Sequence, residues 1–108
     1  MDQSEVMKFE QQNRTLKLSD AIRIGAKLRP QCHGGFSRDG GTCALGAAAE
    51  ALGFDFRDWG LRGPSMYEVL ERLPALRSAR LRGKISQWND YEKLTREQIA
   101  DRLEAMGY

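Results

Sequence analysis

Two residues of this chain have side chains suited to nucleophilic catalysis. Cys43 is expected in the first turn of a helix, where free backbone N–H groups and the positive end of the helix dipole stabilise a thiolate. His33, ten residues earlier, is the only histidine and therefore the only imidazole base for such a nucleophile. Asp39, Asn89 or Asp90 would then orient the imidazole. These residues define one hypothesis, a cysteine-dependent enzyme.

The composition around Cys43 favours a structural role instead. The segment that follows it is rich in alanine and has only Glu50 as a polar residue. In such a buried helix a cysteine commonly serves as a small apolar side chain. A lone histidine beside two glycines, as His33 is, occurs more often as an ordinary loop residue. We therefore commit to no catalytic residue and treat the enzyme as the alternative.

The same part of the chain could also form a metal site. Cys32, His33 and Cys43 could supply three zinc ligands, with Asp39 as the fourth. Known zinc frameworks use two closely spaced ligand pairs, whereas Cys43 stands alone in the sequence. We predict no metal and no cofactor, and we expect both cysteines to be free thiols in a reducing compartment.

A second candidate site is a run of basic residues. Between 75 and 84 the chain has several cations and no acidic residue, and one more arginine and a tryptophan flank the run: Arg72, Arg77, Arg80, Arg82, Lys84 and Trp88. Cations bind phosphates, and an aromatic ring can stack on a base. The run could equally be a solvated face, and the net charge of +2 decides nothing. We predict an anionic protein or a nucleic acid as the partner.

Asn89 and Asp90 follow Trp88 and precede the last expected helix. Asn and Asp side chains commonly satisfy the backbone groups of turns, so the simpler interpretation is a turn beside an aromatic anchor. In the functional alternative, Asn89 and Asp90 approach the loop of His33 and Cys43 and form one polar site with it.

Capping and spacing patterns predict the helices that position these residues. The first is expected at 20–29, with Ser19 as its N-cap, a buried stripe that includes Leu28, and an end at Pro30. The second is expected at 43–52, capped by Thr42 and ended by a left-handed glycine, Gly53. Between them the glycine-rich residues 31–42 are expected to form a loop or a short hairpin.

Two more helices are expected in the second half. One covers 66–73, with a capping box of Ser65 and Glu68. The last begins at the capping box of Thr95 and Gln98, ends at Gly107, and buries residues up to Met106. We interpret 54–63 as an aromatic loop over the core, Gly83 as a break in the pattern at the end of the basic run, and 85–88 as a short extended piece.

The expected fold is mostly α, a compact single domain over residues 1–108 with about four helices, or α+β with one small two-stranded element. Residues 1–13 are polar and are expected to form an arm or a frayed helix. No apolar run reaches the roughly 18 residues that a membrane helix needs, and the N-terminus lacks the pattern of a secretory signal. We expect a cytoplasmic protein without a membrane partner.

Three segments occur in order: LSDAIRIGAKLRPQ at 18–31, GTCALGAAAEALG at 41–53, and WND at 88–90 followed by TREQIADRLE at 95–104. Together they resemble a family of short bacterial and phage-borne proteins of unknown function. The resemblance covers about half of the chain and marks Cys43, Gly46, Asn89 and Asp90 as matching positions. It implies a self-contained domain and no particular activity.

The sequence leaves two functional hypotheses. The leading one is a small, non-enzymatic binding module that uses the basic surface around 72–84. The competing one is an enzyme with Cys43 as nucleophile, His33 as base and Asn89 or Asp90 as orienting group.

Overall fold

The structure is a computed structural model that describes residues 16–35, 37–38, 40–54 and 66–108, with only the backbone of 37, 38, 66 and 67. The expected arm at 1–13, Asp39, Ser65 and residues 55–63 of the expected aromatic loop lie outside the described residues. Phe54, at the start of that loop, is half-buried and packs against the core.

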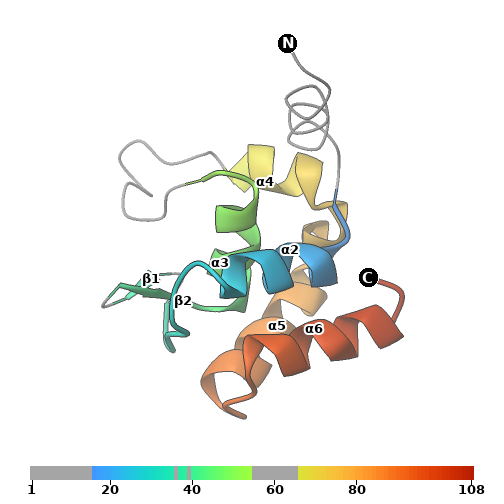
Figure 1. The fold of residues 1–108 in the computed structure, drawn as a ribbon. Helices are drawn as coiled ribbons and strands as arrows, with labels where there is room; N and C mark the ends of the chain where they lie inside the picture. Colours follow the sequence, from blue (N-terminus) through green and yellow to red (C-terminus); the bar gives the residue numbers. More distant parts are fainter. Residues whose placement is uncertain (1–15, 36, 39, 55–65) are drawn as a thin grey trace.

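The described residues form a mostly α fold with a small two-stranded sheet, as predicted. In chain order the elements are α2 (Leu18–Ala26), β1 (Ser37–Arg38), β2 (Gly41–Thr42), α3 (Ala44–Ala51), α4 (Met66–Arg72), the 3₁₀ helix η2 (Pro74–Arg77), α5 (Ala79–Asp90) and α6 (Arg96–Ala105). Helix α2 packs against both α3 and α6, and α5 lies beside α6 (Figure 1).

The sheet is an antiparallel pair in which Ser37 lies opposite Thr42 and Arg38 opposite Gly41. Gln31 adds one parallel bridge to Thr42. The expected short hairpin within 31–42 is therefore confirmed, and it holds the segment after α2 against the start of α3.

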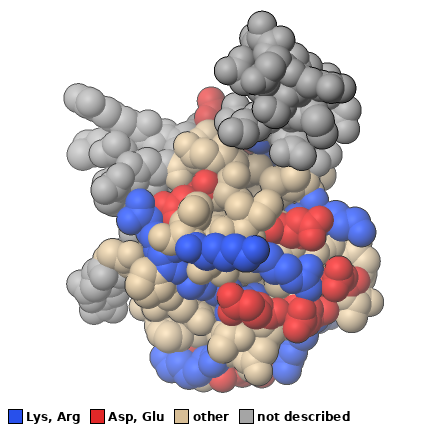
Figure 2. Space-filling view, in the orientation of Figure 1, with Lys and Arg blue, Asp and Glu red and all other residues tan. Residues whose placement is uncertain are grey.

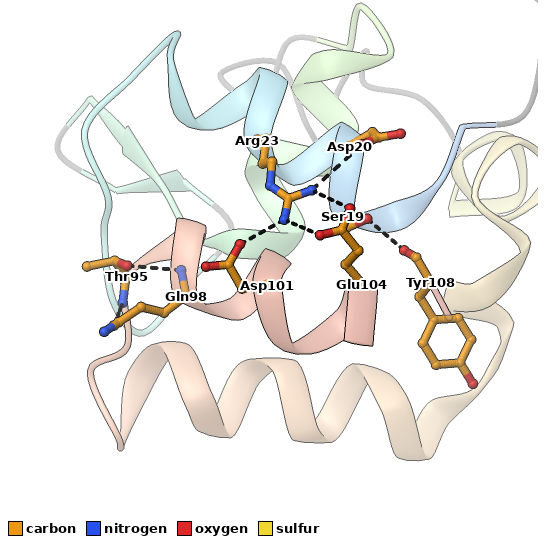
Figure 3. Close-up of polar contacts among 8 residues, drawn as sticks. All are labelled: Ser19, Asp20, Arg23, Thr95, Gln98, Asp101, Glu104 and Tyr108. Carbon is orange, nitrogen blue, oxygen red and sulfur yellow. Dashed lines mark hydrogen bonds and ion pairs between the residues drawn. The ribbon is translucent and has the colours of Figure 1, made fainter. Parts of the chain in front are cut away.

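Helix α2 begins one residue before the predicted cap. Lys17 is the N-cap and makes no side-chain cap bond. Ser19 lies inside the helix and is fully buried, and its hydroxyl donates to the carbonyl of Tyr108 at 2.7 Å (Figure 3). The prediction that Ser19 is the N-cap was wrong because its side chain binds a distant segment instead of the first turn.

The end of α2 also differs from the prediction. Pro30 has no N–H, so the carbonyl of Ala26 lacks the donor that would continue the helix. The helix ends at Ala26, and the N–H groups of Lys27 and Leu28 bond to the carbonyls of Ile24 and Gly25 in a tight last turn. Leu28 lies beyond the helix and is 57% exposed, so its assignment to the buried stripe was wrong.

The contact between α2 and α3 brings the two backbones together. A Cβ atom placed on Gly25 would lie 1.8 Å from the carbonyl oxygen of Ala47, which no side chain could tolerate. Ala44, Ala47 and Ala48 of α3 are fully buried. The small residues of α3 therefore make it the central helix, as its composition predicts.

Cys43 caps α3, and its Sγ accepts a hydrogen bond from the N–H of Gly46 at 3.3 Å. The prediction of Thr42 as the cap was wrong by one residue, because Thr42 belongs to β2. The predicted left-handed glycine after this helix is confirmed, since Gly53 has a φ of 93°.

Helix α5 was not predicted. The break expected at Gly83 and the extended piece expected at 85–88 were both wrong, because one helix runs through both. Ser78 caps the helix by accepting from the N–H of Leu81 at 3.1 Å. Leu81, Ile85 and Asn89, spaced four residues apart, face inward. Gly83 lies on the exposed side, where its cost to a helix of about 1 kcal/mol does not outweigh the packing.

The predicted helices at 66–73 and after Thr95 are present as α4 and α6. Val69 and Leu73 are buried, and Pro74 opens η2. The capping box of Thr95 and Gln98 is confirmed (Figure 3). Met106 is 48% exposed, so its predicted burial was wrong, because α6 ends at Ala105 before Met106 can turn inward.

Arg96, the first residue of α6, ties three elements together. Its guanidinium donates to the carbonyls of Ala26 and Arg29 and to the carbonyl and hydroxyl oxygens of Thr42. It thereby supplies the donor that Pro30 withholds from the end of α2. Burial lowers the pKa of this guanidinium, which is held by neutral oxygen acceptors.

One apolar core joins the described helices. Its largest fully buried aliphatic side chains come from α2, α5, α6 and the end of α4: Leu18, Ile22, Leu73, Ile85, Ile99 and Leu103. Among the described residues, no helix is both long and apolar enough to cross a membrane.

Candidate functional site

A pocket of about 170 Å³ opens where the start of α3 meets α5. Three segments line it: glycines 34 and 35, residues 43–45, and the α5 residues Ile85, Ser86, Asn89 and Asp90. The structure thus brings Cys43, Asn89 and Asp90 together at one place, although 45 residues separate Cys43 from the helix turn that carries the other two.

Cys43 is a poor nucleophile in this setting. Only 8% of the residue is exposed, and burial raises the pKa of its thiol from 9.0 to about 11. The N–H groups of Gly46 and Leu45 favour the thiolate but do not offset burial, and the nearby Asp90 carboxylate also disfavours it. At neutral pH the side chain is therefore a buried thiol that caps a helix.

Asn89 lines the pocket and connects α5 with two other segments of the fold. It is 1% exposed and makes four hydrogen bonds. Its Oδ1 accepts from Gln31 Nε2 and from the N–H of Ala44, and its Nδ2 donates to the carbonyl of Cys32 and to Asp90 Oδ1. All the bonding capacity of its amide is used, so it holds α5, α3 and the segment after α2 in register.

Asp90 lies at the rim of the pocket and is half-buried. Its Oδ1 accepts from the N–H of Gly34 at 2.9 Å and from Asn89 at 2.8 Å. Its Oδ2 makes no hydrogen bond with any described residue. The carboxylate is thus held in place by one oxygen while the other is available.

His33 is half-exposed and does not line this pocket. The neighbouring Cys32 is buried, and its Sγ donates to the carbonyl of Gly35 at 3.4 Å. Cys32 and Cys43 are not joined by a disulfide. No three His, Cys, Asp or Glu side chains in the described part of the chain gather closely enough to hold a metal ion.

Three of the six residues singled out for the basic surface are engaged in the fold. Arg72 donates to the carbonyl of Leu52 at 3.1 Å, at the end of α3. Arg82 donates to the carbonyl of Leu76. Trp88 packs against the core, and the Arg102 guanidinium lies over its ring at 5.3 Å. These three side chains hold elements together.

The other three cations are exposed at the start of α5 and in η2. Arg77 bonds weakly to the carbonyl of Leu70 at 3.3 Å, and Arg80 and Lys84 bond to no described residue. None of the three pairs with a carboxylate in the described part of the chain.

Arg23 on α2 shows the contrast. Its guanidinium reaches the carboxylates of Asp101 at 2.8 Å, Glu104 at 3.1 Å and Asp20 at 3.8 Å (Figure 3). Basic and acidic side chains lie side by side over the face formed by α2 and α6 (Figure 2). Arg23 is thus paired with carboxylates, whereas Arg77, Arg80 and Lys84 pair with no carboxylate among the described residues.

Gln87 and Tyr91, which were not predicted as site residues, continue the exposed side of α5 beyond Lys84. Arg80, Lys84, Gln87 and Tyr91 have helical spacing on one face, and Tyr91 is 84% exposed. Ser86, which lines the pocket, was not predicted either. The spacing of Leu81, Ile85 and Trp88 after the potential cap Ser78 was the signal that could have revealed both.

Comparison of the chain with protein-family models, curated proteins and solved structures found no match. The pocket and the exposed side of α5 are therefore the features from which we infer a function.

Proposed function

We propose that the protein is a non-enzymatic binding module that binds single-stranded nucleic acid through the outer face of α5, defined by Arg77, Arg80, Lys84, Gln87 and Tyr91. The observation that carries the proposal is that the three cations are exposed and have no carboxylate partner among the described residues. Phosphates would provide the missing counter-charge.

The position of these cations supports a partner outside the chain. Arg80 lies in the first turn of α5 and Arg77 precedes the helix, and this turn has no acidic residue. A cation in the first turn of a helix, as Arg80 is, is unfavourable by roughly 0.3–1 kcal/mol. A sequence selected for stability alone would have carboxylates there, so an anionic ligand is the simplest reason for the arrangement.

Tyr91 favours nucleic acid over an acidic protein. It lies on the same side of the helix as Arg80 and about 16 Å further along, at 1.5 Å per residue. An exposed ring at that distance from a row of cations can stack on a base while the cations contact the backbone. The amide of Gln87 lies between them.

The competing hypothesis of a cysteine-dependent enzyme has less support. Its nucleophile, Cys43, is buried and has a raised thiol pKa, and its base, His33, does not line the pocket. We further propose that the protein acts in the cytoplasm, because Cys32 and Cys43 are not joined by a disulfide and a reducing compartment disfavours such bridges.

Binding of fluorescent single-stranded DNA and RNA oligonucleotides, measured by anisotropy over a range of salt concentrations, tests the proposal. We expect Arg80→Glu/Lys84→Glu to weaken binding at least tenfold. Lys17→Glu/Lys27→Glu is the matched control, because it makes the same charge change at exposed cations outside this face. Equal losses in both variants would mean that only net charge matters.

Tyr91→Ala separates the two kinds of anionic partner. Loss of stacking would weaken oligonucleotide binding by about fivefold or more. If an oligoglutamate peptide binds as tightly as the oligonucleotides and Tyr91→Ala changes neither affinity, the surface recognises an acidic protein and the nucleic-acid proposal is wrong.

A further inference from the structure

The pocket between α3 and α5 has a size and a chemistry of its own, separate from the outer face of α5. Its volume of about 170 Å³ is close to that of cavities near 150 Å³ that hold benzene. It therefore has room for a group of about six non-hydrogen atoms. Gly34 is exposed and Asp90 is half-buried, so the pocket meets solvent at the Asp90 side.

Most polar groups around the pocket already have partners. The Asn89 amide is fully bonded, and the N–H groups of Ala44 and Gly46 at the start of α3 bond to Asn89 Oδ1 and Cys43 Sγ. Two groups keep free capacity toward a ligand: Asp90 Oδ2 and the hydroxyl of Ser86, neither of which bonds to a described residue. Ser86 and Asp90 lie one helical turn apart on α5.

The charge of the pocket selects the sign of the ligand. Asp90 is its one ionisable carboxylate, and no Lys, Arg or His is among the described residues that line it. An anion would meet this carboxylate and would find no cation to pair with among the described residues that line the pocket. A cation with several N–H donors would find acceptors in Asp90 and Ser86.

The rest of the lining is apolar. Ile85, Ala44 and Leu45 are buried side chains on the inner walls. A short aliphatic chain could contact them while its polar end stays at the Asp90 rim, as amphipathic side chains do at protein surfaces.

We propose that this pocket binds a primary alkylammonium group, with the ammonium at Asp90 and Ser86 and the aliphatic chain against Leu45 and Ile85. An alkylammonium of four to six carbons matches the size derived above. Such a group occurs in free aliphatic amines and in lysine side chains, and both sources present the same chemistry to the pocket.

Three probes of equal length test the charge and the apolar part: n-butylammonium chloride, n-butanol and sodium butyrate, at constant ionic strength. Binding is followed by amide chemical shifts of Gly34, Gly35 and Ala44 in the full chain. We expect these amides to shift with butylammonium at lower concentration than with butanol, and not with butyrate. Equal binding of all three probes, or preference for butyrate, would overturn the proposal.

Asp90→Asn tests the role of the carboxylate while keeping an oxygen for Gly34 and Asn89. We expect butylammonium to bind about tenfold more weakly or worse and butanol to be little changed, since a charge-assisted hydrogen bond is lost. Glu92→Gln is the matched control, because it removes one exposed carboxylate outside the pocket. Unchanged butylammonium binding in Asp90→Asn would refute the assignment.

A second variant keeps the test valid if Asp90→Asn does not fold. Ser86→Val narrows the pocket from the half-buried side of α5 and should weaken butylammonium and butanol together. If Ser86→Val leaves butylammonium binding unchanged, the ligand does not occupy this pocket. Nα-acetyl-lysine methylamide identifies the source: binding as tight as butylammonium indicates a lysine side chain, and much weaker binding indicates a free amine.

Discussion

The inner and outer sides of α5 use polar residues in opposite ways. On the inner side, Asn89 is 1% exposed and makes four hydrogen bonds, to two other segments and to its neighbour Asp90. On the outer side, Arg80 and Lys84 are exposed and form no hydrogen bond or ion pair with any described residue. The same helix thus carries Asn89, whose partners all lie inside the fold, and two cations that have no partner among the described residues.

We therefore expect residues on the inner side of α5 to contribute to stability and residues on its outer side to contribute to binding. A buried polar group whose partners would be left unpaired contributes to stability when present and is costly to remove. An exposed cation without a partner contributes little to stability and keeps its charge for a ligand. Substitutions on the two sides should therefore affect different measurements.

Asn89→Ala should produce the largest effect. It removes the acceptor of the Ala44 N–H, the amide donor to the carbonyl of Cys32, and one of the two acceptors of Gln31 Nε2. We expect the free energy of unfolding to fall by about 3–4 kcal/mol in urea titrations. Gln87→Ala, on the exposed side of the same helix, should stay within about 0.5 kcal/mol. Similar losses in the two variants would contradict the comparison.

Burial of the Cys43 thiol predicts that the free energy of unfolding depends on pH, with an effect smaller than that of Asn89→Ala. The folded thiol has a pKa of about 11, above its ordinary value of 9.0, so the folded state holds this proton more tightly than the unfolded state. The stabilisation is complete below pH 9 and is lost as the pH rises through 11, by up to about 3 kcal/mol. Unfolding free energies at pH 7 and 10.5 measure it.

Cys43→Ala isolates this contribution from the lysines and tyrosines that titrate in the same range. The variant should lose less stability than the native chain between the two pH values. An identical loss would mean that the Cys43 thiol is not protected by burial. Fast alkylation of Cys43 in the native protein at pH 8 would lead to the same conclusion and revive the enzyme hypothesis.

Arg80→Glu should have the smallest effect on stability and the opposite sign. It puts a carboxylate in the first turn of α5, where the helix dipole favours it by roughly 0.3–1 kcal/mol. We expect a slight rise in the midpoint of thermal unfolding together with weaker oligonucleotide binding. A loss of more than 1 kcal/mol would show that Arg80 supports the fold. Arg82→Ala is the comparison, because Arg82 bonds to the carbonyl of Leu76 and its loss should destabilise.

Local patterns predicted the helices whose signals lie within a few residues of one another. The capping box at Thr95 and the glycines at 53 and 107 mark true helix ends. Helix α5 was not predicted because Gly83 interrupts the local helical pattern, although Leu81 and Ile85 have the apolar spacing of a helix. The packing of that spacing against the core outweighs the local cost of the glycine.

The candidate sites were less predictable because they depend on contacts between distant segments. The sequence indicated Cys43, Asn89 and Asp90 as chemically interesting but offered no distance between them, and it could not reveal that Asn89 uses its whole amide inside the fold. It likewise could not separate Arg72 and Arg82, which bind carbonyls, from Arg80 and Lys84, which do not. Those assignments follow from tertiary structure alone.

Arg96 has a consequence for the order in which the chain folds. Its hydrogen bonds join residues 54 to 70 positions apart in the sequence. Closing such long loops costs conformational entropy before any of these hydrogen bonds can form. We therefore expect the Arg96 hydrogen bonds to form late in folding. We expect Arg96→Lys to accelerate unfolding in stopped-flow experiments and to leave the folding rate nearly unchanged. A slower folding rate would instead place the docking of α6 at the rate-limiting step.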